Sequence, residues 1–238
     1  MERPDRRNKV LFLDFDGVIC DSVDECFVSS WLAYADYTGK RRTSVSLANY
    51  VQFKSYRPLI RRGADYLLLQ LCIDRDIPLR EQADFDAQEA AVGDEGMDTF
   101  HRLFYAARGG LLESDRDYWL GLHRIYPGIY DTLVSVADSA WILTTKEVSF
   151  VREILQFNDL RWPSEKLICS GKERKLEIIN GLLRDGEEAV FVDDQIDHFS
   201  GADNSRISCY LAAWGYVKPE WLRENVRVLQ IQDFSDLI

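Results

Sequence analysis

The feature that most constrains the fold is a short apolar run near the N-terminus that ends in two acidic residues. Residues 10–13 read Val-Leu-Phe-Leu, and Asp14-Phe15-Asp16-Gly17 follows directly. An apolar run of this length, bounded by turn residues, is typical of a buried parallel strand. Ligands of open α/β sheets bind just beyond the carboxyl ends of such strands. We therefore expect Asp14 and Asp16 to face a ligand site.

The spacing of the two aspartates indicates catalysis. Side chains alternate along an extended segment, so Asp14 and Asp16 are expected to emerge on the same side, while Gly17 permits a tight backbone exit. Two carboxylates so close together repel each other unless a cation lies between them or one keeps its proton. Either arrangement favours a catalytic site over an acidic surface turn.

Composition excludes several classes of protein. A chain of 238 residues with 46% hydrophobic residues is long enough for one large domain, or for a core and a smaller domain. The net charge of -11 argues against a nucleic-acid-binding protein. Five scattered cysteines without a C-x-x-C pair favour reduced thiols in the cytoplasm. No membrane partner is expected, because the apolar runs are too short for a signal peptide after the basic stretch 3–9 or for a membrane span.

The order of the expected elements indicates an α/β core with an inserted helical domain. Helices are expected over residues 22–37, 56–73, 81–107 (interrupted near Gly93 and Gly96) and 114–126. Helix and strand then alternate: helix 129–137, strand 140–144, helix 147–157, strand 167–169, helix 173–183, strand 189–192, a short helix, strand 207–212 and strand 226–230. This alternation predicts a doubly wound, mainly parallel sheet with helices on both faces. The predicted core comprises residues 1–20 and 125–238, and the helical domain comprises residues 21–124.

The run Leu-Phe-Leu-Asp-Phe-Asp-Gly-Val-Ile-Cys-Asp-Ser at residues 11–22 resembles the first signature of the haloacid dehalogenase-like superfamily. Its members are mostly Mg²⁺-dependent phosphohydrolases that work through an aspartyl-phosphate intermediate. The resemblance implies a Rossmann-like core with a helical cap inserted after the first motif. It also implies that Asp14 is the nucleophile and that Asp16 is the general acid and base. The carboxylate of Asp16 favours phosphatase over dehalogenase chemistry, because a departing halide needs no proton.

Two later segments supply expected phosphate-binding residues. The strand 140–144 ends in a hydroxyl and resembles the second motif, which implies that Thr144 binds the phosphoryl group with help from the Thr145 backbone. Segment 170–175 opens a helix and carries two lysines that could reach the phosphate as point charges. Lys172 fits the family's spacing better, and Lys175 remains open as the alternative.

The third strand end supplies expected metal ligands. Asp193, Asp194 and Asp197 follow an apolar run, and carboxylate oxygens are the hard ligands that Mg²⁺ requires. Resemblance to the fourth motif implies a Mg²⁺ ion held by the Asp14 carboxylate, the Asp16 backbone carbonyl and Asp193. Asp194 or Asp197 would supply the second acidic contact, and helix capping is the alternative role for Asp194.

Together these patterns predict a magnesium-dependent phosphatase that acts on a small phosphorylated metabolite. A phosphomutase or phosphotransferase, and a non-catalytic binding module, are the alternatives. Substrate choice is expected to lie in the helical domain, where Arg57, Arg61 and Arg62 form a possible anion-recognition cluster and solvated arginines are the other interpretation. Arg57 is favoured because it precedes Pro58 at an expected helix start. All three histidines are expected to be structural. The sequence predicts no oligomeric state.

Overall fold

The computed structural model describes residues 9–39, 46–200 and 205–237. The first eight residues of the expected core, including most of the basic stretch, lie outside the described residues, as do residues 40–45 of the expected helical domain and residues 201–204 and 238. The chain divides into two compact units. One comprises the chain up to Asp21 together with the chain from Arg124 onward, and the other comprises Ser22–His123. No described helix is long and apolar enough to cross a membrane.

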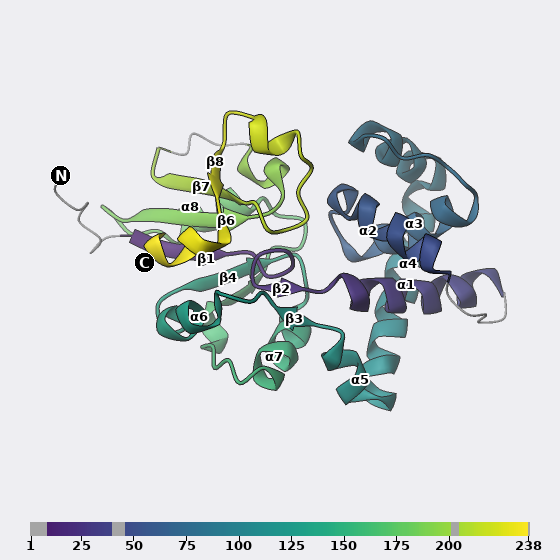
Figure 1. Ribbon diagram of the computed structural model, residues 1–238, viewed down its shortest axis with the longest axis horizontal. Coiled ribbons are helices and arrows are strands. Elements are labelled where there is room, and N and C mark those ends of the chain that lie inside the picture. The colour runs from purple at the N-terminus through teal and green to yellow at the C-terminus, as the bar shows by residue number, and fades with distance from the viewer. Residues whose placement is uncertain (1–8, 40–45, 201–204, 238) are drawn as a thin grey trace. The chain divides into compact units, whose positions relative to one another are not determined.

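The first unit is built on a parallel sheet of six strands in the order β5-β4-β1-β6-β7-β8 (Figure 1). The strands are β1 (Lys9–Leu13), β4 (Trp141–Thr144), β5 (Leu167–Cys169), β6 (Glu188–Asp193), β7 (Ile207–Ala212) and β8 (Arg227–Leu229). The neighbouring side chains Phe12 and Leu13 are both fully buried, although they point to opposite faces of the sheet. Burial on both faces explains why the central strand reads as a continuous apolar run. The predicted parallel α/β fold is confirmed.

Helices flank this sheet and fill the connections between its strands (Figure 1). They are α6 (Tyr130–Val136), α7 (Val148–Phe157) and α8 (Lys175–Leu182), with the 3-10 helices η3 (Ser164–Lys166), η4 (Ile196–Phe199), η5 (Trp221–Arg223) and η6 (Ile231–Leu237). The helix α8 packs on the sheet through an apolar cluster of Phe12, Leu143, Leu176, Ile179, Ala189, Phe191 and Ile207. This packing fixes the start of α8 near the carboxyl ends of β1 and β6.

A two-stranded antiparallel ribbon marks where the chain leaves the first unit and returns to it. It pairs β2 (Cys20–Asp21) with β3 (Arg124–Ile125), and Cys20 lies opposite Ile125. Neither of these strands was expected, because two residues are too few to show an alternating pattern.

The second unit is entirely helical. Its elements are α1 (Val23–Thr38), α2 (Leu47–Tyr56), η2 (Arg57–Leu59), α3 (Gly63–Asp74), α4 (Gln82–Ser114) and α5 (Arg116–Gly121). Stacked aromatic rings join three of these helices, because the ring of Tyr66 lies 5.9 Å from that of Phe53 and 5.3 Å from that of Phe104. These contacts form part of a separate core for this unit.

Two details of the helical unit differ from expectation. The expected helix over 56–73 is divided, because Ile60 has an extended backbone and the Asp65 carboxylate caps α3 by accepting the amides of Arg61 and Arg62 at 2.9 and 3.0 Å. The helix α2 was not expected, since Phe53 is its only buried residue and its apolar periodicity is weak. The interruption expected near Gly93 is confirmed by a φ of 73° at that residue.

Candidate active site

Acidic side chains meet at the carboxyl edge of the parallel sheet. Asp14 follows β1 and its amide donates a 2.9 Å hydrogen bond to the Val192 carbonyl, while Asp193 ends the neighbouring strand β6. Asp14, Asp193 and Asp194 are buried, and each offers a carboxylate oxygen within 4.8 Å of the other two. Three carboxylates this close form an anionic centre that needs cations.

Lys175 supplies one of these cations. Its Nζ lies 2.9 Å from Asp14 Oδ1 and donates to Asp193 Oδ2 at 2.8 Å. The side chain is the first of α8, and Lys175 is only 3% exposed. Burial lowers the pKa of this lysine, but the two carboxylates outweigh burial and hold the pKa above its ordinary value. Lys175 is therefore a permanent positive charge between Asp14 and Asp193.

The two carboxylates respond to this environment in opposite ways. Asp193 accepts hydrogen bonds from Lys175, from His198 Nδ1 at 2.8 Å and from the Gln195 amide at 2.8 Å. Burial works against ionisation of Asp193, yet His198 and Lys175 outweigh burial and hold its pKa below the usual range. Burial raises the pKa of Asp14, and Lys175 only partly offsets this effect. Ionised Asp14 is thus under-compensated, which favours an additional cation beside it.

Asp194 is held against the backbone of two loops. Its Oδ2 accepts the Tyr216 amide at 2.8 Å, and a Cβ atom on either Gly17 or Gly215 would collide with the Asp194 side chain. Gly17 also has a φ of 90°, a conformation that disfavours residues with a side chain. The Tyr216 hydroxyl donates to Asp21 Oδ1 at 2.8 Å. Sequence reasoning missed Tyr216, for which the only signal was a glycine close after an apolar strand.

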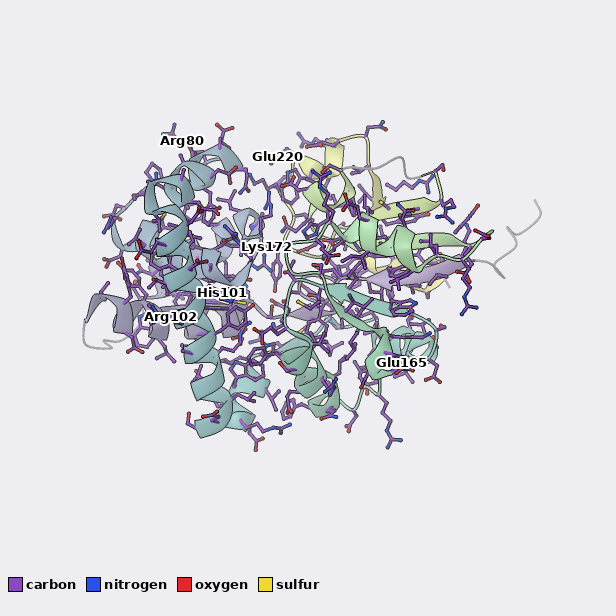
Figure 2. The ribbon with its side chains drawn as sticks, turned by 180° about the vertical axis from the view of Figure 1, so that it is seen from behind. Arg80, His101, Arg102, Glu165, Lys172 and Glu220 are labelled. Carbon is purple, nitrogen blue, oxygen red and sulfur yellow. The ribbon has the colours of Figure 1, made fainter. Side chains whose placement is uncertain are left out.

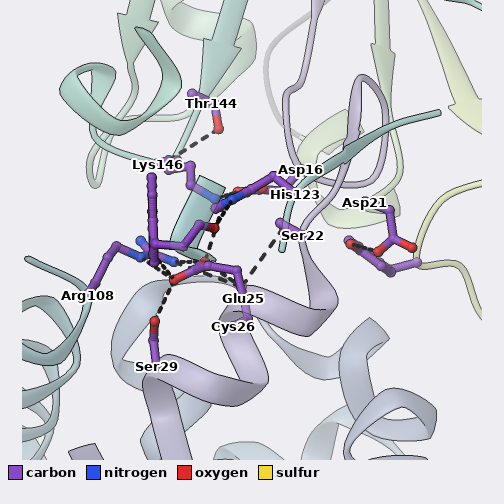
Figure 3. Close-up of polar contacts among 12 residues, drawn as sticks. Asp16, Asp21, Ser22, Glu25, Cys26, Ser29, Arg108, His123, Thr144 and Lys146 are labelled. Carbon is purple, nitrogen blue, oxygen red and sulfur yellow. Dashed lines mark hydrogen bonds and ion pairs between the residues drawn. The ribbon is translucent and has the colours of Figure 1, made fainter. Parts of the chain in front are cut away.

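Asp16 lies on the turn that follows β1 and contacts a second lysine. The amide of Cys20 donates to the Phe15 carbonyl at 2.9 Å, which closes the turn. Lys146 Nζ donates to Asp16 Oδ1 at 2.9 Å, and Oδ2 is 3.3 Å away (Figure 3). The Lys146 amide donates to Thr144 Oγ1 at 3.2 Å, so the buried strand-end threonine orients the turn that carries the lysine. Lys146 had no predicted role, because nothing in the neighbouring sequence indicates its partner.

Two expected site residues lie elsewhere. Lys172 (Figure 2), the favoured phosphate lysine, is exposed on the turn before α8. Lys175 takes the place at Asp14. The preference for Lys172 is wrong in placement, because α8 begins only at Lys175 and the residues before it form a turn through Gly171 with a φ of 55°. Asp197 is exposed on η4, whereas Asp194 is buried beside Asp14. Thr145 is half-buried next to Thr144.

The arginines expected to recognise an anion are engaged by the helical unit itself. The buried Arg57 guanidinium lies 5.4 Å from the centre of the Tyr66 ring. Arg61 Nη1 donates to the Pro58 carbonyl at 3.3 Å. Arg62 forms ion pairs with Asp65, at 3.2 Å, and with Glu89. Their role in substrate binding stays a prediction.

The parallel sheet and the helical unit inserted after its first strand form a fold that the chain shares with solved structures, among them haloacid dehalogenase-like hydrolases, as the resemblance predicted. A candidate phosphoglycolate phosphatase from Lactobacillus delbrueckii superposes with a TM-score of 0.62 at 16% identity, covering 96% of this chain and 97% of its own. A predicted phosphatase from Clostridium acetobutylicum gives a TM-score of 0.58 at 14% identity, with 96% of each chain covered. A haloacid dehalogenase-like hydrolase from Streptococcus pneumoniae gives 0.57 at 14% identity, covering 97% of this chain and 96% of its own.

The sequence comparisons add nothing to this structural likeness. No protein-family profile matches the chain, and no curated protein matches it. Identities of 14 to 16% show a shared fold and leave the activity to be argued from the site.

Proposed function

We propose that the protein is a Mg²⁺-dependent phosphomonoesterase that acts on a small phosphorylated metabolite through an aspartyl-phosphate intermediate. The observation that carries this proposal is the buried group of Asp14, Asp193 and Asp194 around Lys175 at the carboxyl edge of the sheet. Perturbed carboxylates at such an edge are typical of catalytic sites. The solved structures with the same fold, which are named as phosphatases or hydrolases, support the same class of reaction.

The residues at the edge fit a magnesium ion. Mg²⁺ prefers a few carboxylate oxygens and keeps several waters, and three buried carboxylates within reach of one another meet that preference. The Asp14 carboxylate, the Asp16 backbone carbonyl and Asp193 would hold the ion, with Asp194 as the second acidic contact. When bound, the ion offsets the negative charge on the phosphoryl oxygens.

The chain's own residues would carry the bond-making steps. A carboxylate oxygen of Asp14 forms a bond to phosphorus while the bond from phosphorus to the ester oxygen breaks. Asp16 gives its proton to the departing oxygen, and afterwards takes a proton from the water that hydrolyses the aspartyl phosphate. Lys175 and Thr144 bind the phosphoryl oxygens, Lys175 as a buried charge and Thr144 as a hydroxyl donor.

The two units would divide the work. The first unit is the catalytic core, and the helical unit Ser22–His123 is the cap that selects the substrate. Arg57 and Arg61 belong to this cap and are the proposed specificity residues. Because one structural neighbour is a candidate phosphoglycolate phosphatase, small phosphorylated acids head the substrates to screen, with and without EDTA.

The decisive experiment is Asp14→Asn assayed on a generic aryl phosphate with Mg²⁺ or with EDTA. Losing the nucleophile should reduce metal-dependent phosphate release by about 10³-fold or more while the far-UV circular dichroism spectrum is kept. The matched control is Asp197→Asn, which removes an exposed carboxylate from the same acidic segment and should leave turnover unchanged. Turnover retained by folded Asp14→Asn would contradict the proposed function.

A further inference from the structure

Lys146 is a buried cation that the proposed mechanism does not use. Its residue is 4% exposed, and its Nζ contacts both oxygens of Asp16, at 2.9 and 3.3 Å. The Asp16 side chain is 17% exposed, so the ammonium covers the general acid from the protein side and leaves it open to solvent elsewhere. Burying a charged lysine is costly unless a partner of opposite charge compensates it, and Asp16 is that partner for Lys146.

The position of Lys146 is fixed by the backbone around it. Its amide donates to Thr144 Oγ1 at 3.2 Å, and the Thr144 carbonyl accepts the Ser170 amide at 2.8 Å, which ties the turn to the next strand end. The ammonium also lies 5.9 Å from the centre of the Phe15 ring, next to Asp16 in sequence. The segment that follows β4 therefore places the Lys146 ammonium beside the turn that follows β1.

The two buried lysines serve different carboxylates. Lys175 contacts Asp14 and Asp193, the pair assigned to phosphorus and the metal, whereas Lys146 contacts Asp16. The site thus carries one cation for the phosphoryl group and a separate cation for the proton donor. This separation indicates that the residue that protonates the leaving group has a lysine of its own.

We propose that Lys146 is a positioning residue that holds the Asp16 carboxyl group in place for proton donation to the leaving group. The inference rests on the proposed function. As the bond from phosphorus to the ester oxygen breaks, the oxygen keeps the electron pair and takes the Asp16 proton, and the contact of 2.9 Å with Lys146 Nζ keeps the carboxyl group of Asp16 in position. The consequence is a hydrolase whose rate depends only weakly on how good the leaving group is.

The test is the leaving-group dependence of kcat/KM for a series of aryl phosphates. kcat/KM covers the steps up to formation of the aspartyl phosphate, and phenols that are weaker acids need the proton more. In Lys146→Met the value for p-nitrophenyl phosphate should fall less than about threefold, while that for phenyl phosphate, whose leaving group has a pKa of about 10, should fall about 10²-fold. Lys146→Arg, which keeps the charge, should recover most of the loss.

Further variants separate this role from a structural one. Asp16→Asn should steepen the leaving-group dependence in the same way, and adding Lys146→Met to it should change little, because the two residues act as a unit. The exposed Lys172→Met is the matched control and should leave the dependence unchanged. If Lys146→Met does not fold, Lys146→Gln removes the charge with less change in polarity and should show the same steepening.

Two outcomes would overturn the inference. An equal loss on all aryl phosphates would make Lys146 structural, and a raised KM with an unchanged leaving-group dependence would make it a substrate-binding cation. Either outcome with an inactive Asp14→Asn leaves the proposed function standing. An active Asp14→Asn would instead remove the proposed function itself.

Discussion

The protein buries two groups of charged side chains, and the contrast between them separates a structural network from the candidate active site. In the helical unit the Glu25 carboxylate accepts both Nε and Nη2 of Arg108, at 2.9 and 2.8 Å (Figure 3). Ser29 Oγ and Trp119 Nε1 also donate to Glu25 Oε1, at 2.7 and 3.2 Å. One carboxylate thus receives a bidentate guanidinium and further donors, which is the pattern of a satisfied buried ion pair.

At the sheet edge, several carboxylates share few donors. Asp14, Asp193 and Asp194 lie within reach of one another, and the ammonium of Lys175 and the imidazole of His198 contact that group. Burial raises the pKa of Asp14, whereas the neighbouring Glu25 outweighs burial and raises the pKa of Arg108. The Glu25 carboxylate is satisfied by donors of its own unit, whereas the proposed function requires a ligand at the sheet edge. Charge balance, more than burial, therefore distinguishes the two.

The largest expected effect is a loss of stability when the buried Glu25–Arg108 ion pair is broken. Arg108→Met leaves the Glu25 carboxylate buried without its bidentate partner and should lower the free energy of unfolding by about 3–5 kcal/mol, measured by urea denaturation. The control is Arg102→Met, on the same helix α4 but exposed (Figure 2), which should change stability by less than about 0.5 kcal/mol. The double variant Glu25→Leu/Arg108→Met should recover part of the loss. A loss below about 1 kcal/mol for Arg108→Met would contradict the assignment.

The next effect concerns activity. Lys175→Met removes the cation between Asp14 and Asp193 and should lower kcat by about 10²–10³-fold, equivalent to about 2.7–4 kcal/mol of transition-state stabilisation. Steady-state assays of Lys175→Met and Lys172→Met side by side test this directly. Equal activity of the two variants would show that the lysine at the sheet edge has no part in the reaction.

Mg²⁺ should stabilise the folded protein through the acidic group at the sheet edge and not through the Glu25–Arg108 network. At about 100 times its Kd, an ion bound only to the folded protein adds about 2.7 kcal/mol, which a thermal-shift titration measures. Asp194→Asn should reduce this gain, while Asp197→Asn and a folded Arg108→Met should keep it. A gain that survives Asp194→Asn would place the ion away from the three buried carboxylates.

The smallest effect is a pH dependence of opposite sign at two neighbouring aspartates, measured with EDTA present. The folded pKa of Asp14 is raised, so its ionised form destabilises the fold, and Asp14→Asn should be more stable than wild type at pH 7. This advantage should shrink as the pH falls through the raised pKa. The folded pKa of Asp193 is depressed, so Asp193→Asn should be less stable than wild type at every pH above the ordinary aspartate pKa of about 3.9.

Urea midpoints across the pH range would show both trends. The Asp193→Asn deficit should close only as the pH falls through the depressed pKa. If both variants changed the urea midpoint in the same direction relative to wild type, the opposite pKa shifts of the two aspartates would be contradicted.

What the sequence predicted well were features encoded locally. The apolar runs at residues 10–13 and 189–192 predicted two central strands, because burial on both faces leaves few polar positions in them. The placement of Asp14 and Asp193 at one edge follows from parallel pairing alone. Short elements such as β2 and β3 carry too few residues to leave a pattern.

Contacts across long stretches of chain could not be predicted in this way. Lys172 and Lys175 lie three residues apart, and only the packing of α8 on the sheet decides which reaches Asp14. Lys146 finds Asp16, and Tyr216 finds Asp194, through the folding of distant segments. A single sequence shows the residue types in these pairs but not the pairing.

The position of β1 in the sheet has a consequence for how the chain is made. β1 leaves the ribosome before the other strands of its sheet, yet its hydrogen-bonding neighbours are β4 and β6, whose paired residues lie at 141–142 and 188–192. The contacts of the helical unit are closer in sequence and can form during synthesis, whereas β1 must wait for most of the chain. The strand that precedes Asp14 is therefore synthesised early and paired late. Until it pairs, its apolar side chains remain accessible, so the chain can aggregate or bind chaperones through them.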